Sequence, residues 1–251
     1  MEAQPYLDAD LPDIKAALAR WACEAGRCGY CHPGDLEHRI HRERDTPRPA
    51  FVWYDEVGLA GVEIAERFGH VFDLFVRPDI RGGDVEVDML EQAASRSDET
   101  DVFACDAPRI EALERLEFEQ YRAWDHIRTR PLDDIPPVSV PTGFVLRAYG
   151  GDLAVETGDT TRAAFTTIWF DDVNKVGLFE PVGTEPAFLR LGLARAVMTD
   201  GLRRMREAGM HTALVEHDIA NEPAAALYAS LGFTVAYETV GFHATPRPSS
   251  T

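Results

Sequence analysis

The amino-acid sequence predicts an α/β fold of mixed α+β type, in which two halves share one order of elements. Residues 176–233 read as a strand, a tight turn, a long amphipathic helix, a second strand and a short helix. Residues 71–118 read in the same order. Residues 131–141 are rich in proline and lack hydrophobic periodicity. We therefore predict a first domain over residues 1–130, a linker over residues 131–141 and a second domain over residues 142–251.

The first domain is predicted to begin with two helices. Residues 10–24 form the first helix, because Asp10 can cap it and Pro12 suits its first turn. Its apolar residues recur at helical spacing, and they are Ile14, Leu18, Trp21 and Ala22. The second helix is shorter and covers residues 35–43, after a His-Pro-Gly turn.

A hairpin and a strand–turn–helix unit complete this pattern. The hairpin strands are residues 51–54 and 59–65, and residues 71–76 form the next strand. A turn with two adjacent glycines then leads into a helix over residues 85–95.

In the second domain, the turn before the long helix suits an anion. Gly192 and Ala194 are small, so a ligand can approach the backbone closely. The first amides of a helix have no intrahelical partner, and the helix dipole adds partial positive charge there. Such a site suits a pyrophosphate. A turn that simply requires a small residue would give the same pattern.

The last helix of the second domain has clear boundaries. It follows a strand at residues 212–215. Asn221 can cap the helix, Pro223 suits its first turn, and Gly232 suits a left-handed helix end.

These two motifs resemble those of the GNAT family of N-acetyltransferases. The segment NEPAAALYASLGF, residues 221–233, is similar to the family's Asn…Ala-x-x-Leu-Tyr-x-x-x-Gly-Phe signature. The segment RLGLARA, residues 190–196, is similar to its Gln/Arg-x-x-Gly-x-Gly/Ala loop for the coenzyme A pyrophosphate. One departure is that the usual Gln or Arg falls on Leu189, with Arg190 beside it. The resemblance implies two tandem GNAT-like domains, each a mixed, largely antiparallel sheet with a parallel splayed strand pair and flanking helices.

The resemblance also implies acetyl-CoA as co-substrate, and we expect no metal because the zinc-ligand pattern among the cysteines is incomplete. The residues expected to bind the coenzyme are Val182, Arg190, Leu191, Gly192, Leu193, Ala194, Arg195, Asn221, Ala225 and Tyr228. Backbone N–H groups of the strand at residues 176–182 would bind the thioester carbonyl. Asn221 would bind the pantetheine arm or a water, although a plain helix cap would look the same in sequence.

Two residues are candidates for proton transfer. By resemblance, Tyr228 is the general acid for the leaving thiolate, with a tyrosine that merely packs on the sheet as the alternative. We favour Glu180 as general base, directly or through water, because a carboxylate on an apolar strand is costly unless it is used or paired. A salt-bridged Glu180 is the alternative. Glu216, His217 and Asp218 are rival bases.

The first domain has the same order of strands, turns and helices, but it lacks the residues of the two motifs. The two copies align in two segments, one with Pro78 matched to Pro186 and one with Pro108 matched to Pro223, and the second segment aligns without a gap. The pairs are Pro78 with Pro186, Arg81 with Leu189, Asp84 with Gly192, Glu86 with Ala194, Pro108 with Pro223, Asp106 with Asn221, Leu113 with Tyr228, Glu117 with Gly232, and Phe118 with Phe233. The carboxylates of Asp84 and Glu86 would face the coenzyme's phosphates, where like charges about 4 Å apart repel by about 4 kcal/mol at an effective dielectric constant near 20. We therefore expect a degenerate acetyltransferase domain.

The acceptor side of the second domain lacks a family feature. The family has two helices after the first strand, whereas here the strand at residues 144–149 leads through a short loop, residues 150–161, to a strand at residues 163–170. The acceptor wall is therefore open, or the first domain supplies it. An open site also permits a homodimer.

We therefore predict an acetyl-CoA-dependent N-acetyltransferase that acts on an amine of a small molecule or protein. A non-catalytic acyl-CoA sensor or interaction module is the alternative, because Leu189 and the missing helices weaken the match. A zinc-dependent binding protein is a third reading.

The zinc reading rests on Cys23, Cys28, Cys31 and His32, but the second half of a zinc-ligand pattern is incomplete. We expect these cysteines and Cys105 to be free thiols in a reducing cytosol.

The net charge and hydropathy of the sequence limit the classes of binding partner and the location of the protein. The formal net charge is −18, from 43 acidic and 25 basic residues, which disfavours binding to nucleic acid or anionic membrane. Lys15 and Lys175 are the only lysines, and an acidic, lysine-poor surface is typical of adaptation to high salt. An ordinary acidic cytosolic protein is the alternative. We expect a cytoplasmic location, since no apolar run could span a bilayer and residues 1–15 do not form a signal peptide.

Overall fold

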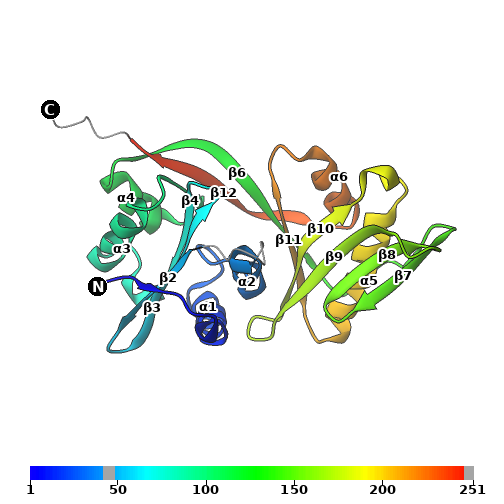
Figure 1. The fold of residues 1–251 in the computed structure, drawn as a ribbon, viewed down its shortest axis with the longest axis horizontal. Helices are drawn as coiled ribbons and strands as arrows, with labels where there is room; N and C mark the ends of the chain where they lie inside the picture. Colours follow the sequence, from blue (N-terminus) through cyan, green and yellow to red (C-terminus); the bar gives the residue numbers. More distant parts are fainter. Residues whose placement is uncertain (42–48, 246–251) are drawn as a thin grey trace. The chain divides into compact units, whose positions relative to one another are not determined.

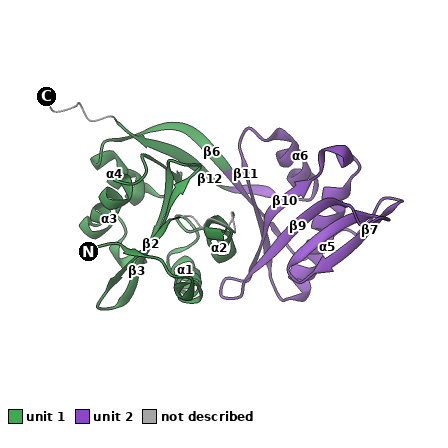
Figure 2. Ribbon diagram, in the orientation of Figure 1, with its two compact units in different colours: residues 1–125, 237–251 green, residues 126–236 purple. Residues whose placement is uncertain are grey.

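The computed structural model describes residues 1–41 and 49–245, and it divides into two compact units (Figure 2). Unit 1 consists of Met1–Asp125 and Tyr237–Thr251, and unit 2 consists of His126–Ala236. The last strand of the chain, β12 (Thr234–Ala244), therefore ends in unit 1, where it pairs with β5 (Glu99–Phe103). The proline-rich residues 131–141 lie within unit 2.

Unit 1 is a mixed sheet flanked by helices (Figure 1). Its strands follow the order β1-β2-β3-β4-β5-β12, and the β4–β5 pair is parallel. The strands are β1 (Gln4–Pro5), β2 (Ala50–Asp55), β3 (Gly58–Arg67), β4 (Val71–Val76), β5 and β12, followed by the first part of β6 (Phe118–Pro131). The helices are α1 (Leu11–Ala25), α2 (Pro33–His41), α3 (Asp84–Ala94) and α4 (Ala107–Arg115), with short 3-10 turns at Asp8–Asp10 and Pro78–Ile80.

Strand β4 lies between two hydrophobic cores because its side chains alternate. Phe72 and Leu74 belong to the core that also contains residues of α3 and α4. Phe75 belongs to the core that contains residues of α1 and α2. All six residues of β4 are buried, which explains its nearly continuous apolar sequence.

Unit 2 repeats the strand–turn–helix order, with its own run of sheet strands (Figure 1). From the end of β6 its strands follow the order β6-β11-β10-β9-β8-β7, and the β10–β11 pair is parallel. Its elements are β7 (Phe144–Tyr149), β8 (Asp152–Thr157), β9 (Arg162–Asp171), β10 (Val176–Thr184), a 3-10 turn (Pro186–Phe188), α5 (Leu193–Glu207), β11 (Thr212–Asp218) and α6 (Glu222–Ser230). One face of this sheet packs on α5 through Phe179, Val197 and Leu202.

The helices and strands predicted for the first domain are confirmed to within two residues where they are described. The last two residues of the predicted helix at 35–43 lie outside the described residues. One prediction in the second domain is wrong, because the loop expected at residues 150–161 contains the strand β8. Residues 144–171, all of them described, form strands and turns without the two helices typical of the family.

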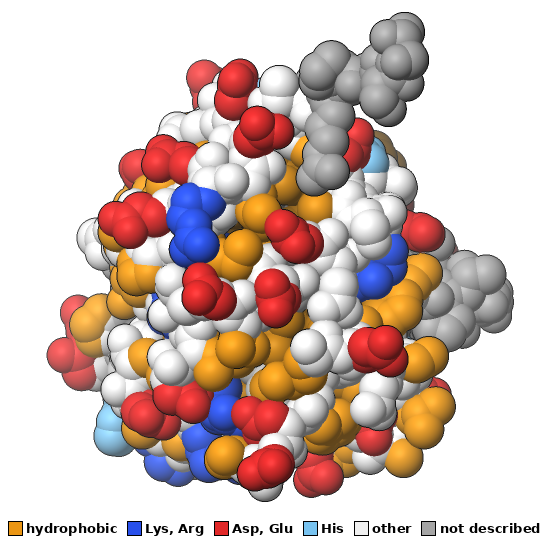
Figure 3. All heavy atoms as spheres, turned by 90° about the vertical axis from the view of Figure 1, so that its left-hand side faces the viewer, with side chains coloured by type: hydrophobic (Ala, Val, Ile, Leu, Met, Phe, Trp, Pro, Cys, Tyr) orange, Lys and Arg blue, Asp and Glu red, His pale blue; other side chains and the backbone are white. Residues whose placement is uncertain are grey.

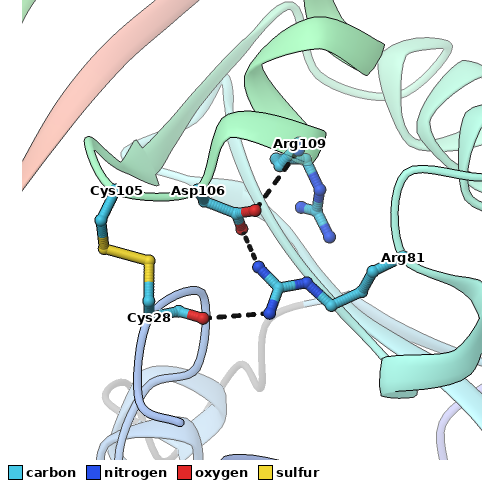
Figure 4. Close-up of a disulfide and its surroundings, with 5 residues drawn as sticks. All are labelled: Cys28, Arg81, Cys105, Asp106 and Arg109. Carbon is cyan, nitrogen blue, oxygen red and sulfur yellow. Dashed lines mark hydrogen bonds and ion pairs between the residues drawn. A yellow bond between two sulfur atoms is a disulfide. The ribbon is translucent and has the colours of Figure 1, made fainter. Parts of the chain in front are cut away.

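The prediction of free thiols is wrong for two of the four cysteines. Cys28 and Cys105 form a disulfide within unit 1, and they are 77 residues apart in the sequence (Figure 4). The bond joins the loop after α1 to the turn before α4. Cys23, which is exposed, and Cys31, which is buried, are not part of a disulfide. Because the sulfur of Cys28 is bonded to Cys105, it is not available to the zinc site considered from the sequence.

Acidic side chains are spread over the face shown in Figure 3, among hydrophobic ones and with few lysines or arginines. This distribution agrees with the net charge of −18. Within residues 1–41 and 49–245, no helix has the length and apolar character that a membrane crossing requires.

Candidate active site

The candidate active site begins where two parallel strands of unit 2 separate. Strands β10 and β11 pair from Val176 with Thr212 to Phe179 with Val215, and both strands continue beyond the last pair. On its other side, β10 changes register against β9 between Phe179 and Val182. The resulting irregularity leaves backbone groups near Glu180 outside the regular ladder, as expected for a splayed pair.

The loop after β10 gives the start of α5 a backbone geometry that suits an anion. Arg190 and Gly192 both adopt left-handed backbone conformations, with φ of 64° and 80°. Gly192 is the residue before the helix, and Ala196 donates the first intrahelical hydrogen bond, to the Gly192 carbonyl at 3.1 Å. The amides of Leu193, Ala194 and Arg195 therefore precede the helical hydrogen-bond ladder. A Cβ at Gly192 would meet nothing within 4 Å, so this end of the helix is open.

Individual residues of this loop contribute differently. Leu193 is buried in the core, so only its amide can face a ligand. Leu189 and Leu191 are exposed, at 56% and 48%. The Arg195 side chain donates to the Ser230 carbonyl at 3.2 Å, which links the start of α5 to the end of α6.

Tyr228 is buried on α6 and lies within the electrostatic influence of Glu180. Only 5% of the Tyr228 surface is exposed, and its ring lies 5.6 Å from that of His217 and 6.2 Å from that of Phe233. Burial, and to a smaller extent the negative charge of Glu180, raise the pKa of the Tyr228 hydroxyl. The charge of Glu180 therefore acts on the Tyr228 hydroxyl, and these are the two residues that the sequence predicts for proton transfer.

Glu180 occupies the irregular segment of β10. It is half-buried, and its backbone carbonyl accepts a hydrogen bond from Trp169 Nε1 at 2.6 Å. Trp169 pairs with Leu178 across the β9–β10 ladder, so the indole holds the strand at the point where its register changes.

His217, a rival base from the sequence, has both ring nitrogens engaged. Nδ1 lies 2.8 Å from the Asp218 carbonyl, which only accepts, so Nδ1 carries the proton. Nε2 accepts a hydrogen bond from Arg128 Nε at 2.8 Å. The lone pair that a general base would need is therefore occupied.

The pH dependence of stability tests this account of His217. Burial, the charge of Arg128 and the neighbouring His126 lower the pKa of His217 below its ordinary 6.5. Below pH 6.5 the unfolded chain binds a proton that the folded chain resists, so stability falls as pH falls. From pH 7 to pH 5, wild type should lose more stability than His217→Gln, by at most about 1.4 kcal/mol per pH unit. Urea denaturation at each pH measures the difference, and parallel curves for the two proteins would contradict the account.

The remaining predicted coenzyme residues lie around the same splayed pair. Val182 follows the irregular segment of β10 and pairs with Thr166. Asn221 caps α6, and its side-chain oxygen accepts the Ala224 amide at 3.2 Å. Ala225 lies three residues before Tyr228 and so on the same face of α6.

In unit 1, the equivalent helix start is closed by its own side chains. Helix α3 begins after Gly83, and its third residue, Glu86, is fully buried. One Glu86 oxygen accepts the Gly82 amide, and the other accepts Arg109 Nε. Arg109 also donates to the Leu74 carbonyl at 2.8 Å, beyond the point where β4 and β5 stop pairing.

This arrangement corrects two expectations from the sequence. The helix starts match at Gly83 and Gly192, one residue away from the alignment of Pro78 with Pro186. The third helical residue is therefore Glu86 in unit 1 and Arg195 in unit 2, which is a reversal of charge. Asp84 does not face the helix end, because its side chain is exposed and lies 3.4 Å from Arg115.

Arg109 belongs to a network that also includes the disulfide (Figure 4). Asp106 caps α4 by accepting the Arg109 amide at 3.3 Å, and its other oxygen lies 2.5 Å from Arg81. Arg81 also donates to the Cys28 carbonyl at 3.0 Å. The sequence analysis did not identify Arg109. A comparison of the two last helices could have identified it, because the third residue of α4 is Arg109 whereas the third residue of α6 is Ala224.

Sequence comparison identifies the class of protein that this fold and site define. The family model described as "Acetyltransferase (GNAT) family" matches residues 107–233, about half of the chain. The chain therefore belongs to the GNAT family of acetyltransferases.

Two curated relatives carry the name mycothiol acetyltransferase. The protein from Nocardiopsis dassonvillei is 36% identical over 107 residues, which cover 43% of this chain and 32% of the relative. The protein from Thermomonospora curvata is 29% identical over 147 residues, which cover 42% of this chain and 50% of the relative. The chain thus matches between about a third and a half of the length of these relatives.

Solved structures share the fold over almost the whole chain. A tandem GNAT protein from the clavulanic acid biosynthesis pathway has a TM-score of 0.63 and 15% identity, and the match covers 98% of this chain and 99% of that one. A GCN5-related N-acetyltransferase from Sphaerobacter thermophilus has a TM-score of 0.58 and 14% identity, with 100% and 98% covered. These matches confirm the predicted fold class.

Proposed function

We propose that the chain transfers an acetyl group from acetyl-CoA to an amine, and that unit 2 carries the reaction. The observation that supports this most strongly is that unit 2 combines separating parallel strands and an open helix start at Gly192 with a buried Tyr228 hydroxyl on which the charge of Glu180 acts. The amides of residues 191–195 and the side chain of Arg190 would hold the diphosphate.

The proton transfers follow from the environment of the two side chains. Glu180 takes a proton from the acceptor amine, directly or through a water, so that the nitrogen can attack the acetyl carbonyl. Backbone N–H groups in the irregular part of β10 stabilise the charge on the carbonyl oxygen. Tyr228 then gives its proton to the departing sulfur. This hydroxyl is protonated at neutral pH, as an acid requires, because the ordinary pKa of tyrosine is already about 10 and burial raises the pKa of Tyr228 further.

Unit 1 is proposed to be a degenerate domain without coenzyme. The domain boundaries predicted from the sequence are 1–130 and 142–251, and they stay a proposal for where each of the two copies begins and ends. The buried Glu86 carboxylate already accepts an amide at the helix start, and Arg109 lies in the gap that the pantetheine arm would need. An incoming phosphate would have to displace this ion pair.

The acceptor is proposed only as an amine of a small molecule or peptide. The acceptor used by the mycothiol acetyltransferases is one member of the panel to be tested, because the two curated relatives carry that name. A cytoplasmic location, adaptation to high salt, a homodimer, and no binding to nucleic acid or membrane also stay proposals from the sequence. Mass measurement with and without reductant tests the location indirectly, since disulfides such as Cys28–Cys105 are rare in reducing compartments.

A non-catalytic acyl-CoA sensor is the second candidate function. It is favoured by the exposed Leu189, which stands where the family motif has a polar residue that can contact a phosphate. The two functions differ in turnover. Release of free thiol that depends on an amine supports the enzyme, whereas coenzyme binding without thiol release under any acceptor supports the sensor.

Coenzyme binding at Gly192 is tested by two variants that differ only in charge. Gly192→Asp and Gly192→Asn carry similar side chains, and both residues tolerate a left-handed backbone better than most. The Asp carboxylate repels a phosphate about 4 Å away by about 1 to 4 kcal/mol, according to the local dielectric constant. We expect acetyl-CoA to bind Gly192→Asp between about fivefold and a thousandfold more weakly than Gly192→Asn.

A thermal shift titration measures this difference. Wild type at a hundredfold excess of acetyl-CoA over the dissociation constant should gain about 2.7 kcal/mol of stability. Equal affinities for the two variants would place the diphosphate elsewhere.

A further inference from the structure

The sheet of unit 2 has a polar, aromatic surface on the face opposite α5. Strand register places Arg147, Ala154, Phe165 and Gly183 in one row across β7, β8, β9 and β10. The Phe165 ring lies over Gly183, because a Cβ at Gly183 would come within 2.5 Å of the ring. We name this surface the β7–β9 face and define it by Arg147, Tyr149, Asp152, Arg162, Phe165 and Thr167.

Two arginines mark one end of the β7–β9 face. The Arg162 guanidinium lies 6.0 Å from the centre of the Phe165 ring, and Arg162 is exposed. Arg147 lies 3.0 Å from the buried Glu156 carboxylate, which also accepts the Tyr149 hydroxyl at 2.7 Å. Glu156 therefore fixes Arg147, whereas Arg162 forms no ion pair among the residues that the structure describes.

The opposite end of the face is acidic and leads to the reaction centre. Asp152 accepts the Thr167 hydroxyl at 2.6 Å. Thr167 lies beside Glu180, since Phe179 pairs with Ile168 and Val182 pairs with Thr166. Positive charge thus lies at the Arg162 end of the face, and negative charge at the Glu180 end.

We propose that this face selects an amine acceptor that also carries an anionic group, a carboxylate or a phosphate. This inference rests on the proposed acetyl transfer. The protonated amine docks at the acidic end, and Arg162 binds the anion with its planar pair of donors. Arg162 and Thr167 pair with Glu156 and Asp152 on β8, which are about 13 Å apart at about 3.3 Å per residue. Since the side chains at both ends reach toward the acceptor, its amine and anion are about 10 Å apart.

Two peptides that differ by one charge test the proposal. In Gly-Gly-Asp amide, the free amine and the carboxylate span about 10 Å when the chain is extended. Gly-Gly-Asn amide has nearly the same shape without the charge. We expect the KM of the Asp peptide to be at least about tenfold lower than that of the Asn peptide. Arg162→Gln should abolish that difference, and the control Arg206→Gln, an exposed arginine on α5, should keep it.

The outcomes separate the proposed function from this inference. Thiol release at equal KM for both peptides, or a difference that survives Arg162→Gln, overturns the anion site and leaves the transferase intact. If neither peptide is acetylated, calorimetric titration of the two peptides into the protein with coenzyme A decides. Tighter binding of the Asp peptide, lost in Arg162→Gln, supports the anion site, and equal binding overturns it.

Discussion

Tyr228→Phe is expected to lower kcat by about 100-fold or more, while the affinity for acetyl-CoA stays within about threefold of wild type. The substitution removes the hydroxyl and leaves the ring, so the contacts with His217 and Phe233 remain. A positioned general acid contributes typically about 10²- to 10⁴-fold to a rate. The loss should fall on kcat, because the proton moves only when the thiolate leaves.

Thiol release at saturating acceptor measures kcat, and a binding titration measures the affinity for coenzyme. Tyr121→Phe in unit 1 is a suitable control, because Tyr121 is 42% exposed and its hydroxyl bonds to Glu99. A kcat for Tyr228→Phe within about threefold of wild type would remove Tyr228 from the mechanism. Equal losses of kcat and of coenzyme affinity would instead indicate a binding role.

Arg109→Met is expected to lower the free energy of unfolding by about 3 to 5 kcal/mol. It leaves the Glu86 carboxylate buried at 0% exposure without its cationic partner, and such broken pairs are strongly destabilising. The Leu74 carbonyl also loses a donor. Arg115→Met is the matched control, because Arg115 is more than half exposed and its change should stay within about 0.5 kcal/mol.

Urea denaturation followed by tryptophan fluorescence measures both variants. The double variant Glu86→Gln with Arg109→Met should recover part of the loss, because no unpaired charge is then buried. Coenzyme affinity at temperatures where Arg109→Met is folded should stay near wild type, since the proposed binding residues lie in unit 2. If Arg109→Met changes the free energy of unfolding by less than about 1 kcal/mol, the Glu86–Arg109 ion pair does not hold the start of α3 in unit 1 closed.

Hydrophobic periodicity and helix signals were sufficient to predict most elements. The helix at α5 and the cap at Asn221 were predictable because local residues determine them. Strand β8 was missed because it is short and follows two glycines, so its pairing partners β7 and β9 define it more than its own sequence does. The pairing of β12 with β5 joins residues more than 130 positions apart, and no local pattern could indicate it.

The candidate site was predictable in part for the same reason. Gly192, Tyr228 and Glu180 belong to segments whose local order fixes their positions, so the sequence could place them at a helix start, on a short helix and on a strand. The Glu86–Arg109 pair depends on the packing of α3 against α4, across 23 residues of sequence. The Cys28–Cys105 bond depends on a fold that brings two distant loops together. Such contacts follow from tertiary structure, which periodicity does not encode.

A crystal structure with bound acetyl-CoA tests the central claim most directly. We predict one coenzyme per chain, with its diphosphate on the amides of residues 191–195 and its sulfur within reach of the Tyr228 hydroxyl. Coenzyme at the start of α3 in unit 1, with Glu86 displaced from Gly82, would contradict the account.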